Sequence, residues 1–318
     1  MAQIRPQVLL YEKMHSVGTA LLEKKCDVMY AESLDEAYLL KKTRGVDAII
    51  IRANGAVTAD MIQGNPKLKV IGRHGVGLDA IDLAAAKSSG VAVVNTPVAN
   101  SESVAEHFLV LALMLAKKIR QADIALRQGR WGARYELIGT ELKGKTIGVV
   151  GFGKIGQQVA RICHNGLEMQ VLYDDIVRWE QMEAEIGAQK VDRETLFTKA
   201  DAVSINLPLL SATRHAIDAG LLGLMKPTAI IINMARGPIW VESDVVKALA
   251  AGQIAGAGAD VFEQEPAAID NPLFQFDNFV GTPHMSAHTE ESMIKMSLVA
   301  EDVLAVLEGR PPKYPVVV

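Results

Sequence analysis

The chain has 318 residues, of which 49% are hydrophobic, and a formal net charge of -4 at pH 7. This length favours two domains, because single hydrophobic cores rarely grow beyond roughly 250–300 residues. The slightly negative charge excludes the basic surface that a nucleic-acid-binding protein needs.

The cysteines and the apolar segments set further limits. Cys26 and Cys163 lie far apart and lack metal-ligand spacing, so we expect neither a disulfide framework nor a metal site. Two such cysteines fit a reducing, cytoplasmic location. The longest apolar run, 108–116, is too short to span a bilayer, and the N-terminus has no signal-peptide pattern. We therefore expect no membrane association.

Short apolar runs alternate with helix-length segments along the whole chain. They predict strands at 8–11, 48–51, 69–71, 91–94, 146–150, 170–173, 202–205, 229–233, 257–261 and 279–280. Helices such as those at 34–43 and 242–251 separate the strands, which is typical of parallel sheets with helices on both faces. We expect an α/β protein with two doubly wound parallel-sheet domains.

A domain boundary is expected near residues 97–103, where a long helix leads into the second sheet. The C-terminal helix, at about 291–308, can pack back on the first domain. The first domain is therefore expected to be discontinuous, with residues 1–98 and 286–318, and the second to comprise residues 99–285.

The run Gly151-Phe-Gly-Lys-Ile-Gly156 lies between a predicted strand and a predicted helix. This is the context of the dinucleotide-binding fingerprint. Gly151 permits a tight turn, Gly153 lets the backbone approach a pyrophosphate, and Gly156 lets the helix pack closely on the strand. The amides at the helix N-terminus face the phosphates. We expect cofactor contacts from Gly151, Gly153, Lys154, Ile155 and Gly156.

The next strand ends in an acidic residue, Asp174, where the fingerprint expects the ribose ligand. A carboxylate there accepts hydrogen bonds from ribose hydroxyls and repels a 2′-phosphate, so NAD is favoured over NADP. Asp175 follows directly, and the choice between the two stays open, although Asp174 is in better register. Arg178 lies a few residues further on, where its positive charge can weaken this preference for NAD over NADP.

Three polar side chains follow successive strands, at the edge where open α/β sheets bind ligands. The guanidinium of Arg236 can hold a carboxylate and polarise an adjacent carbonyl. His284 can exchange a proton near neutral pH, and Glu265 is the candidate carboxylate to stabilise its imidazolium form. Because all three follow a cofactor-binding motif in the chain, they favour a catalytic site over the alternatives for each residue. These are a surface ion pair for Arg236, a solvated loop position for Glu265 and a capping role for His284.

Further motifs accompany the glycine run. They are Gly72-Arg-His-Gly-Val-Gly-Leu-Asp79, Asn95-Thr-Pro-Val-Ala-Asn100, Val104-Ala-Glu-His107, Asn233-Met-Ala-Arg-Gly237, Asp260-Val-Phe-Glu-Gln-Glu-Pro266 and Thr282-Pro-His284. Through these motifs the chain resembles, over nearly its whole length, the D-isomer-specific 2-hydroxyacid dehydrogenases, which include phosphoglycerate, glycerate and hydroxypyruvate-reducing members. The resemblance implies a flavodoxin-like substrate domain and a Rossmann NAD-binding domain, with an active-site cleft between them.

The resemblance implies that Arg236 binds the substrate carboxylate, that His284 donates and accepts the proton, and that Glu265 tunes it. It also implies a homodimer joined through the region after Val104, including the arm around Trp131. We expect further cofactor contacts from Pro208, Met234 and Asp260, the last at the nicotinamide carboxamide. The expected substrate-binding residues, besides Arg236, are Arg52, Val76, Gly77 and Asn100.

Some positions are left open by the sequence. Lys154 stands where arginine is frequent in the family. His74 and Met285 occupy variable positions that can shape the substrate end, whereas His107 is interpreted as structural and His288 as exposed or capping.

The expected function is hydride transfer between NAD(H) and C2 of a D-2-hydroxy acid or 2-keto acid, in the 3-phosphoglycerate or hydroxypyruvate and glyoxylate group. Arg52 could reach a substrate phosphate. One alternative is a related NAD enzyme such as a formate dehydrogenase, against which the pair of Glu265 and His284 argues. Another is a non-enzymatic, NAD(H)-sensing protein of the corepressor type, because a fold does not fix a function.

Overall fold

The computed structural model describes residues 5–316 of the chain. The chain forms two compact units. Unit 1 comprises Met1–Asn100 and His288–Val318, and unit 2 comprises Ser101–Ala287. The expected domain boundaries were after residues 98 and 285, and the units divide after residues 100 and 287.

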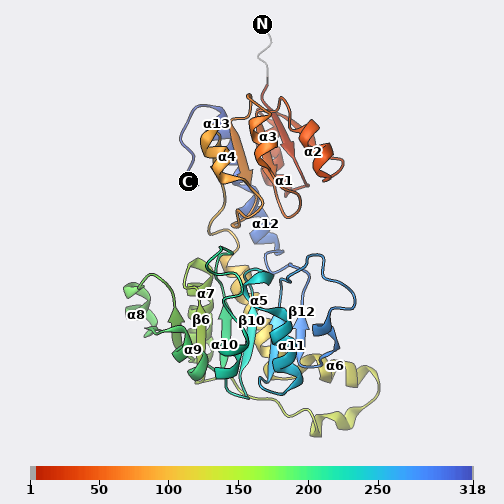
Figure 1. Cartoon of the computed structure of the whole chain (residues 1–318), viewed down its shortest axis with the longest axis vertical. Coiled ribbons are helices and arrows are strands. Elements are labelled where there is room, and N and C mark those ends of the chain that lie inside the picture. The colour runs from red at the N-terminus through yellow and green to blue at the C-terminus, as the bar shows by residue number, and fades with distance from the viewer. Residues whose placement is uncertain (1–4, 317–318) are drawn as a thin grey trace. The chain divides into compact units, whose positions relative to one another are not determined.

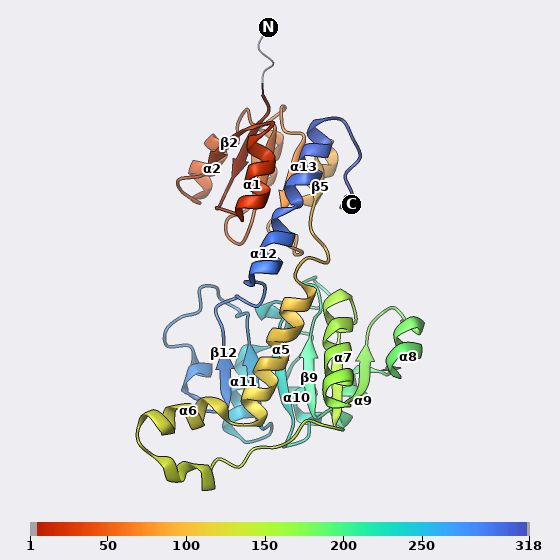
Figure 2. The ribbon, with the colours of Figure 1, turned by 180° about the vertical axis from the view of Figure 1, so that it is seen from behind.

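Unit 1 is built on a five-stranded parallel sheet. Its elements are β1 (Gln7–Leu10), α1 (Ser16–Glu23), β2 (Asp27–Tyr30), α2 (Glu36–Lys42), β3 (Ala48–Ile51), α3 (Ala59–Gln63), β4 (Val70–Arg73), α4 (Leu83–Ser88), β5 (Ala92–Val94), α12 (Glu290–Ser297) and α13 (Val299–Leu307). The strand order β2-β1-β3-β4-β5 is the flavodoxin-like order. Helices α2, α3 and α4 cover one face of the sheet (Figure 1), and α1 and α13 cover the other (Figure 2).

Unit 2 is built on a seven-stranded parallel sheet. Its first elements are α5 (Ser101–Ala116), α6 (Ile119–Arg127), the 3-10 helix η1 (Trp131–Tyr135), β6 (Thr146–Val150), α7 (Lys154–Leu167), β7 (Gln170–Asp174), α8 (Glu180–Ile186) and β8 (Gln189–Lys190). The others are α9 (Arg193–Lys199), β9 (Ala202–Ile205), α10 (Ala219–Leu224), β10 (Ile230–Asn233), η2 (Gly237–Ile239), α11 (Glu242–Ala250), β11 (Gly256–Ala259), η3 (Pro272–Gln275) and β12 (Phe279–Gly281).

The strand order β12-β11-β10-β9-β6-β7-β8 is the Rossmann order with one additional strand. Helices α5 and α7 pack on one face of this sheet (Figure 2), and α9, α10 and α11 pack on the other (Figure 1). The predicted α/β class with two doubly wound parallel sheets is therefore confirmed.

The ten predicted strands are present, each within two residues at either end, and the prediction missed β2 and β8. Both missed strands lie at sheet edges, where side chains stay exposed and the apolar pattern is weak. The prediction of a single C-terminal helix at 291–308 was wrong in one respect. Leu298, with φ -68° and ψ -3°, divides it into α12 and α13.

Both cysteine thiols are buried. Burial raises the pKa of the Cys163 thiol to about 12. Within residues 5–316, no helix has the length and apolar character needed to cross a membrane. The same range holds no group of three or more His, Cys, Asp and Glu side chains arranged to bind a metal ion.

Candidate active site

The expected functional side chains of unit 2 gather at one edge of its sheet. Neighbouring strands are parallel, so their carboxyl ends meet there. The glycine run follows β6 and Asp174 ends β7, whereas Arg236, Asp260 and His284 follow β10, β11 and β12. The strand order reverses at β6, which lies between β7 and β9. Open α/β sheets bind ligands at such a switch point.

The glycine turn is closely packed at two of its positions and open at the third. Gly151 adopts φ +86°, and a Cβ there would lie 2.8 Å from the carbonyl carbon of Asn206. A Cβ on Gly156 would lie 2.2 Å from the carbonyl oxygen of Gly151. Nothing lies within 4 Å of a Cβ placed on Gly153. The open side at Gly153 leaves room for a pyrophosphate against the backbone.

The N-terminus of α7 adds hydrogen-bond donors to this turn. Gly153 is the N-cap residue, and no side chain caps the helix there. The amides of Lys154, Ile155 and Gly156 therefore lack an acceptor within the helix and can bind an anion. The residues of the turn fit the phosphates of a dinucleotide.

The two adjacent carboxylates after β7 have different partners. Asp175 accepts hydrogen bonds from the amides of Phe152 (2.6 Å) and Val177 (2.8 Å), so it holds the glycine turn in place. Asp174 Oδ2 accepts a hydrogen bond from Nε of Arg193 at 2.7 Å. This division of contacts supports Asp174, rather than Asp175, as the ribose ligand.

The arginine beside Asp174 is not the one that the sequence suggested. Arg178 donates two hydrogen bonds to Glu183 Oε2, from Nε at 3.0 Å and Nη2 at 2.8 Å. Arg193, at the start of α9, pairs with Asp174 instead. Sequence reasoning missed Arg193 because the short strand β8 that brings it close has no apolar pattern.

Arg236 projects from a tight turn that follows β10. The buried side chain of Asn233 shapes this turn, since Oδ1 accepts the amide of Ala235 at 3.0 Å and Nδ2 donates to the carbonyl of Arg236 at 2.9 Å. The guanidinium of Arg236 donates from Nη1 to the carbonyl of Ala235 at 2.7 Å. The turn thus holds the arginine at the ligand edge of the sheet.

The segment that carries Glu265 packs directly on this turn. A Cβ on Gly237 would come within 1.9 Å of the carbonyl carbon of Phe262, so only glycine permits the contact. Phe262 in turn donates its amide to Glu265 Oε1 at 3.1 Å. The close approach places the positive charge of Arg236 near Glu265, where it helps to lower the pKa of that carboxyl.

His284 and Glu265 form a hydrogen-bonded pair. Nδ1 of His284 lies 2.8 Å from Oε2 of Glu265, and the side chains are 50% and 38% exposed. Burial acts to raise the pKa of Glu265, but the hydrogen bond and charge of His284 outweigh it and hold that pKa below its usual value. With Nδ1 engaged, Nε2 is the ring nitrogen that can exchange a proton with a ligand.

Asp260 holds the segment that carries His284. Its side chain is 1% exposed, and Oδ1 accepts hydrogen bonds from Thr282 Oγ1 (2.7 Å) and the amide of Met285 (2.8 Å). Oδ2 accepts the amide of Ser286 at 2.9 Å, and the backbone carbonyl accepts the amide of His284 at 2.8 Å. Both carboxylate oxygens thus serve the chain itself, and the contact with a nicotinamide stays a prediction.

Helix α5 supports the same segment. His107 Nε2 lies 2.9 Å from Thr282 Oγ1 and 3.9 Å from Asp260 Oδ1. Ser103 Oγ donates a hydrogen bond to the carbonyl of Ser286. These contacts give His107 the structural setting that the sequence suggested.

Two other expected cofactor contacts also follow strands. Pro208 is exposed in the loop after β9, where its carbonyl accepts a hydrogen bond from Thr213 Oγ1 at 2.5 Å. Met234 directly follows β10 and is 6% exposed within the core that includes Phe152. Their contacts with a cofactor stay predictions.

The remaining expected residues belong to unit 1. Strands β3 and β4 are parallel neighbours, so Arg52 and His74, which follow them, are adjacent. Arg52 donates from Nη1 to the carbonyl of Lys13 at 3.1 Å, and its Nη2 lies 3.4 Å from Nε2 of His288. His74 is 2% exposed, and burial lowers its pKa to about 4. Neither of its ring nitrogens has a hydrogen-bond partner in the described range.

The loop after β4 is held through its carbonyl groups. Asn95 Nδ2 donates to the carbonyl of Val76 at 3.0 Å, and Arg73 Nε donates to that of Gly77 at 2.6 Å. These bonds leave the amides of Val76 and Gly77 as donors for a ligand. The side-chain oxygen of Asn100 is buried and has no partner among residues 5–316.

Comparison with known protein families gives one match that covers most of unit 2. Residues 109–286 match the family described as D-isomer specific 2-hydroxyacid dehydrogenase, NAD binding domain. The glycine turn, Asp174, Arg236, Glu265 and His284 all lie inside the matched range.

Two relatives are similar over nearly the whole chain. D-3-phosphoglycerate dehydrogenase of Archaeoglobus fulgidus is 41% identical over 308 residues, which are 96% of this chain and 58% of that protein. Glyoxylate reductase of Thermofilum pendens is 39% identical and covers 97% of this chain and 93% of its own length. The chain therefore spans just under three fifths of the first relative and nearly all of the second.

A solved structure agrees with the fold. The NADPH-dependent glyoxylate/hydroxypyruvate reductase of Sinorhizobium meliloti, in complex with NADP and malonate, superposes with a TM-score of 0.87 at 29% identity. The match covers 98% of this chain and 97% of that structure.

Proposed function

Because this chain belongs to the D-isomer-specific 2-hydroxyacid dehydrogenase family, we propose that it transfers a hydride between NAD(H) and C2 of a D-2-hydroxy acid or its 2-keto acid. The observation that carries the proposal is the 2.8 Å pair of His284 and Glu265 beside the turn of Arg236. All three residues follow strands at the ligand edge of the NAD-binding unit.

His284 moves the proton in this proposal. In the direction of reduction, Nε2 of the imidazolium donates a proton to the oxygen at C2, while Nδ1 stays bound to Glu265. The carboxylate keeps the ring oriented and stabilises its charged form. In the direction of oxidation, Nε2 takes the proton back.

Arg236 binds and polarises the substrate. Its guanidinium can hold the carboxylate and place a donor at the oxygen on C2, where negative charge develops during reduction. The chemistry that NAD(H) supplies when bound is hydride transfer at C2. The amides of Val76 and Gly77 in unit 1 are proposed as further donors to the carboxylate.

The substrate is proposed to be in the 3-phosphoglycerate or the hydroxypyruvate and glyoxylate group. The relatives named above support both groups, because one is a phosphoglycerate dehydrogenase and another a glyoxylate reductase. Arg52 in unit 1 is the proposed contact for a substrate phosphate, and Asn100 is a proposed contact for the substrate. None of the three relatives named above is a corepressor.

The test is NADH oxidation with hydroxypyruvate, glyoxylate, phosphohydroxypyruvate, pyruvate and a branched 2-keto acid. We expect one of them to be reduced by the wild-type protein. The variant His284→Asn should lower kcat by about two or more orders of magnitude, the usual contribution of a general acid, and leave NADH affinity unchanged. Asparagine is chosen because it tolerates the left-handed backbone at position 284, where φ is 50°. Near-normal turnover by this variant would refute the role of His284.

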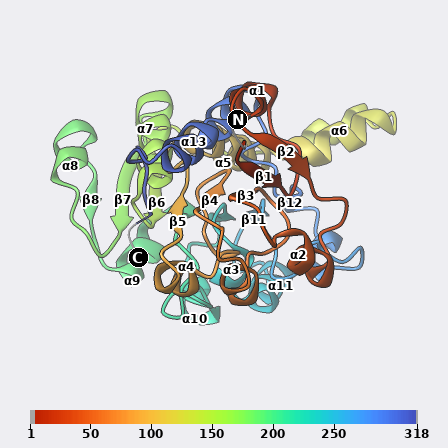
Figure 3. The same cartoon turned by 90° about the horizontal axis from the view of Figure 1, so that it is seen from above.

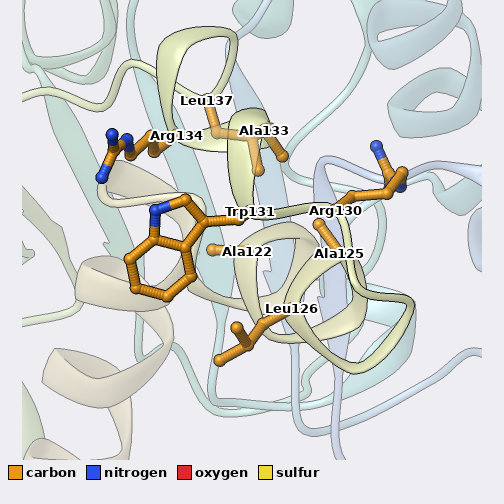
Figure 4. A pocket seen from close by; sticks show the side chains of 8 residues that line it. All are labelled: Ala122, Ala125, Leu126, Arg130, Trp131, Ala133, Arg134 and Leu137. Atoms are coloured by element: carbon orange, nitrogen blue, oxygen red, sulfur yellow. The ribbon is translucent and has the colours of Figure 1, made fainter.

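A homodimer is also proposed, joined through the arm that contains α6 and η1. Helix α6 of this arm extends from the rest of unit 2 (Figure 3), and the arm exposes large apolar side chains, with Leu126, Trp131 and Tyr135 at 57%, 67% and 71%. They lie on or beside a pocket of about 270 Å³, whose lining residues Figure 4 shows. Exposed apolar patches of this kind mark protein contacts. Light scattering should give twice the monomer mass, and Trp131→Asp should shift it toward the monomer.

The buried, unpaired thiols suit the reducing, cytoplasmic location that we also propose.

A further inference from the structure

The expected ribose ligand, Asp174, does not carry its negative charge alone. Arg193 Nε and Asp174 Oδ2 are 2.7 Å apart, and the side chains are 33% and 18% exposed. A lone carboxylate at this place accepts ribose hydroxyls and repels a 2′-phosphate. An ion pair has no net charge, so it removes most of the repulsion that would exclude the phosphorylated nucleotide.

Arg193 also has donors to spare for an anion. A guanidinium carries five N–H donors, and Arg193 uses Nε for its one side-chain hydrogen bond in the described part of the chain. Its planar fork suits a phosphate as well as a carboxylate. The two Nη groups are therefore available to a ligand at the end of β7.

Two other cations near the end of β7, Arg178 and Lys190, are engaged elsewhere. Arg178 is held by Glu183, which also accepts the hydroxyl of Tyr173 at 2.8 Å. Lys190 Nζ lies 3.4 Å from the carbonyl of Ile176. Among these side chains, Arg193 is the cation in contact with Asp174.

We propose that Arg193 sets the cofactor preference of this protein, by neutralising Asp174 and offering its Nη groups to an adenosine 2′-phosphate, so that NADPH is bound as well as NADH. This inference rests on the proposed function, because it concerns the same nucleotide site. It changes the expectation from sequence, in which Asp174 alone favoured NAD.

The test measures binding without turnover. Dissociation constants for NADH and NADPH are obtained by calorimetry on the wild-type chain and on Arg193→Gln, Arg193→Lys and Arg178→Gln. The pair 2′,5′-ADP and 5′-ADP, which lack the nicotinamide, serve as probes of the adenosine end. Thermal unfolding of each variant reports on folding.

For the wild type, we expect the NADPH dissociation constant to lie within about tenfold of that for NADH. Arg193→Gln should weaken the binding of NADPH and 2′,5′-ADP by about tenfold or more, because it removes a charge-assisted contact. It should change the dissociation constant of NADH by less than about threefold. Arg193→Lys should keep part of the NADPH affinity, since it keeps the charge but not the fork. The matched control, Arg178→Gln, should leave two ratios of dissociation constants unchanged: that of NADPH to NADH and that of 2′,5′-ADP to 5′-ADP.

The outcomes separate the inference from the proposed function. Tight NADH binding together with NADPH binding more than about a hundredfold weaker would overturn the inference and leave the proposed function standing. Equal losses for NADH and NADPH in Arg193→Gln would also overturn it. A well-folded protein that binds neither nucleotide would overturn both.

Discussion

Replacing Glu265 with glutamine isolates the electrostatic part of its contact with His284. Glu265→Gln keeps the size of the side chain and an oxygen that can accept from Nδ1, but it removes the negative charge 2.8 Å from the imidazole. In the proposed reduction the imidazolium ring donates the proton, and the carboxylate holds that ring by a charge-assisted hydrogen bond. Without the charge, this contact becomes a weaker, neutral hydrogen bond.

The magnitude follows from the exposure of the pair. Half of the His284 side chain and 38% of the Glu265 side chain are in contact with solvent, so water screens the interaction. Exposed ion pairs contribute roughly 0.2–1 kcal/mol, and about 1.4 kcal/mol corresponds to a factor of ten in rate. We therefore expect Glu265→Gln to lower kcat/KM for keto-acid reduction by about two- to fivefold.

The assay is the rate of NADH oxidation at neutral pH, with the substrate that the panel identifies. Glu263→Gln is the matched control, because Glu263 loses the same charge two positions away and lies near His215 instead. It should leave kcat/KM unchanged. An unchanged kcat/KM in Glu265→Gln, or an equal loss in Glu263→Gln, would refute the reasoning.

Three other predictions concern the fold and the glycine turn. Gly153→Ala should fold normally, because a Cβ there meets nothing within 4 Å, but it should bind NADH more weakly in titrations. The control is Gly166→Ala, which is equally open and lies within α7. It should keep the NADH affinity and raise the free energy of unfolding by about 0.5–1 kcal/mol. Burial lowers the pKa of His74 to about 4, from about 6.5 in the unfolded chain. Between these two pH values the unfolded chain takes up a proton that the folded chain does not, so the free energy of unfolding is full above about pH 6.5 and falls as the pH approaches about 4. Urea unfolding should show that the free energy of unfolding falls by about 3 kcal/mol over that pH window, and the fall should be smaller in His74→Gln. The same fall in the variant would contradict the assignment to His74. Cys26 and Cys163 should resist thiol reagents at pH 8 until the protein unfolds, since burial raises the pKa of both thiols; rapid labelling of native protein would be the contrary result.

The sequence predicted the architecture well because buried parallel strands are apolar on both faces. Strands β3, β6 and β9 have the predicted bounds, and their residues are almost entirely buried. Edge strands carry no such signal. β2 and β8 have exposed positions and went undetected for that reason.

The position of the candidate site was predictable from the strand ends. Arg236, Glu265 and His284 were selected because polar residues after apolar strands point to the ligand edge, and because their motifs resemble a known family; their roles stay predictions. The pairing of Asp174 with Arg193 was not predictable, since it depends on β7 and β8 lying side by side, with Tyr173 opposite Lys190. A contact made by tertiary pairing through an undetected strand leaves no local pattern to read.

The reversal of strand order at β6 has a consequence for how this enzyme family can diversify. The residues proposed to select the electron carrier, Asp174 and Arg193, follow β7 and β8 on one side of β6, whereas Arg236 and His284 follow β10 and β12 on the other. If these proposals hold, a substitution in the first pair changes the preference between NADH and NADPH without altering the residues proposed to bind the substrate and to move the proton. The sheet thus separates two traits that natural selection, or a protein engineer, can change one at a time.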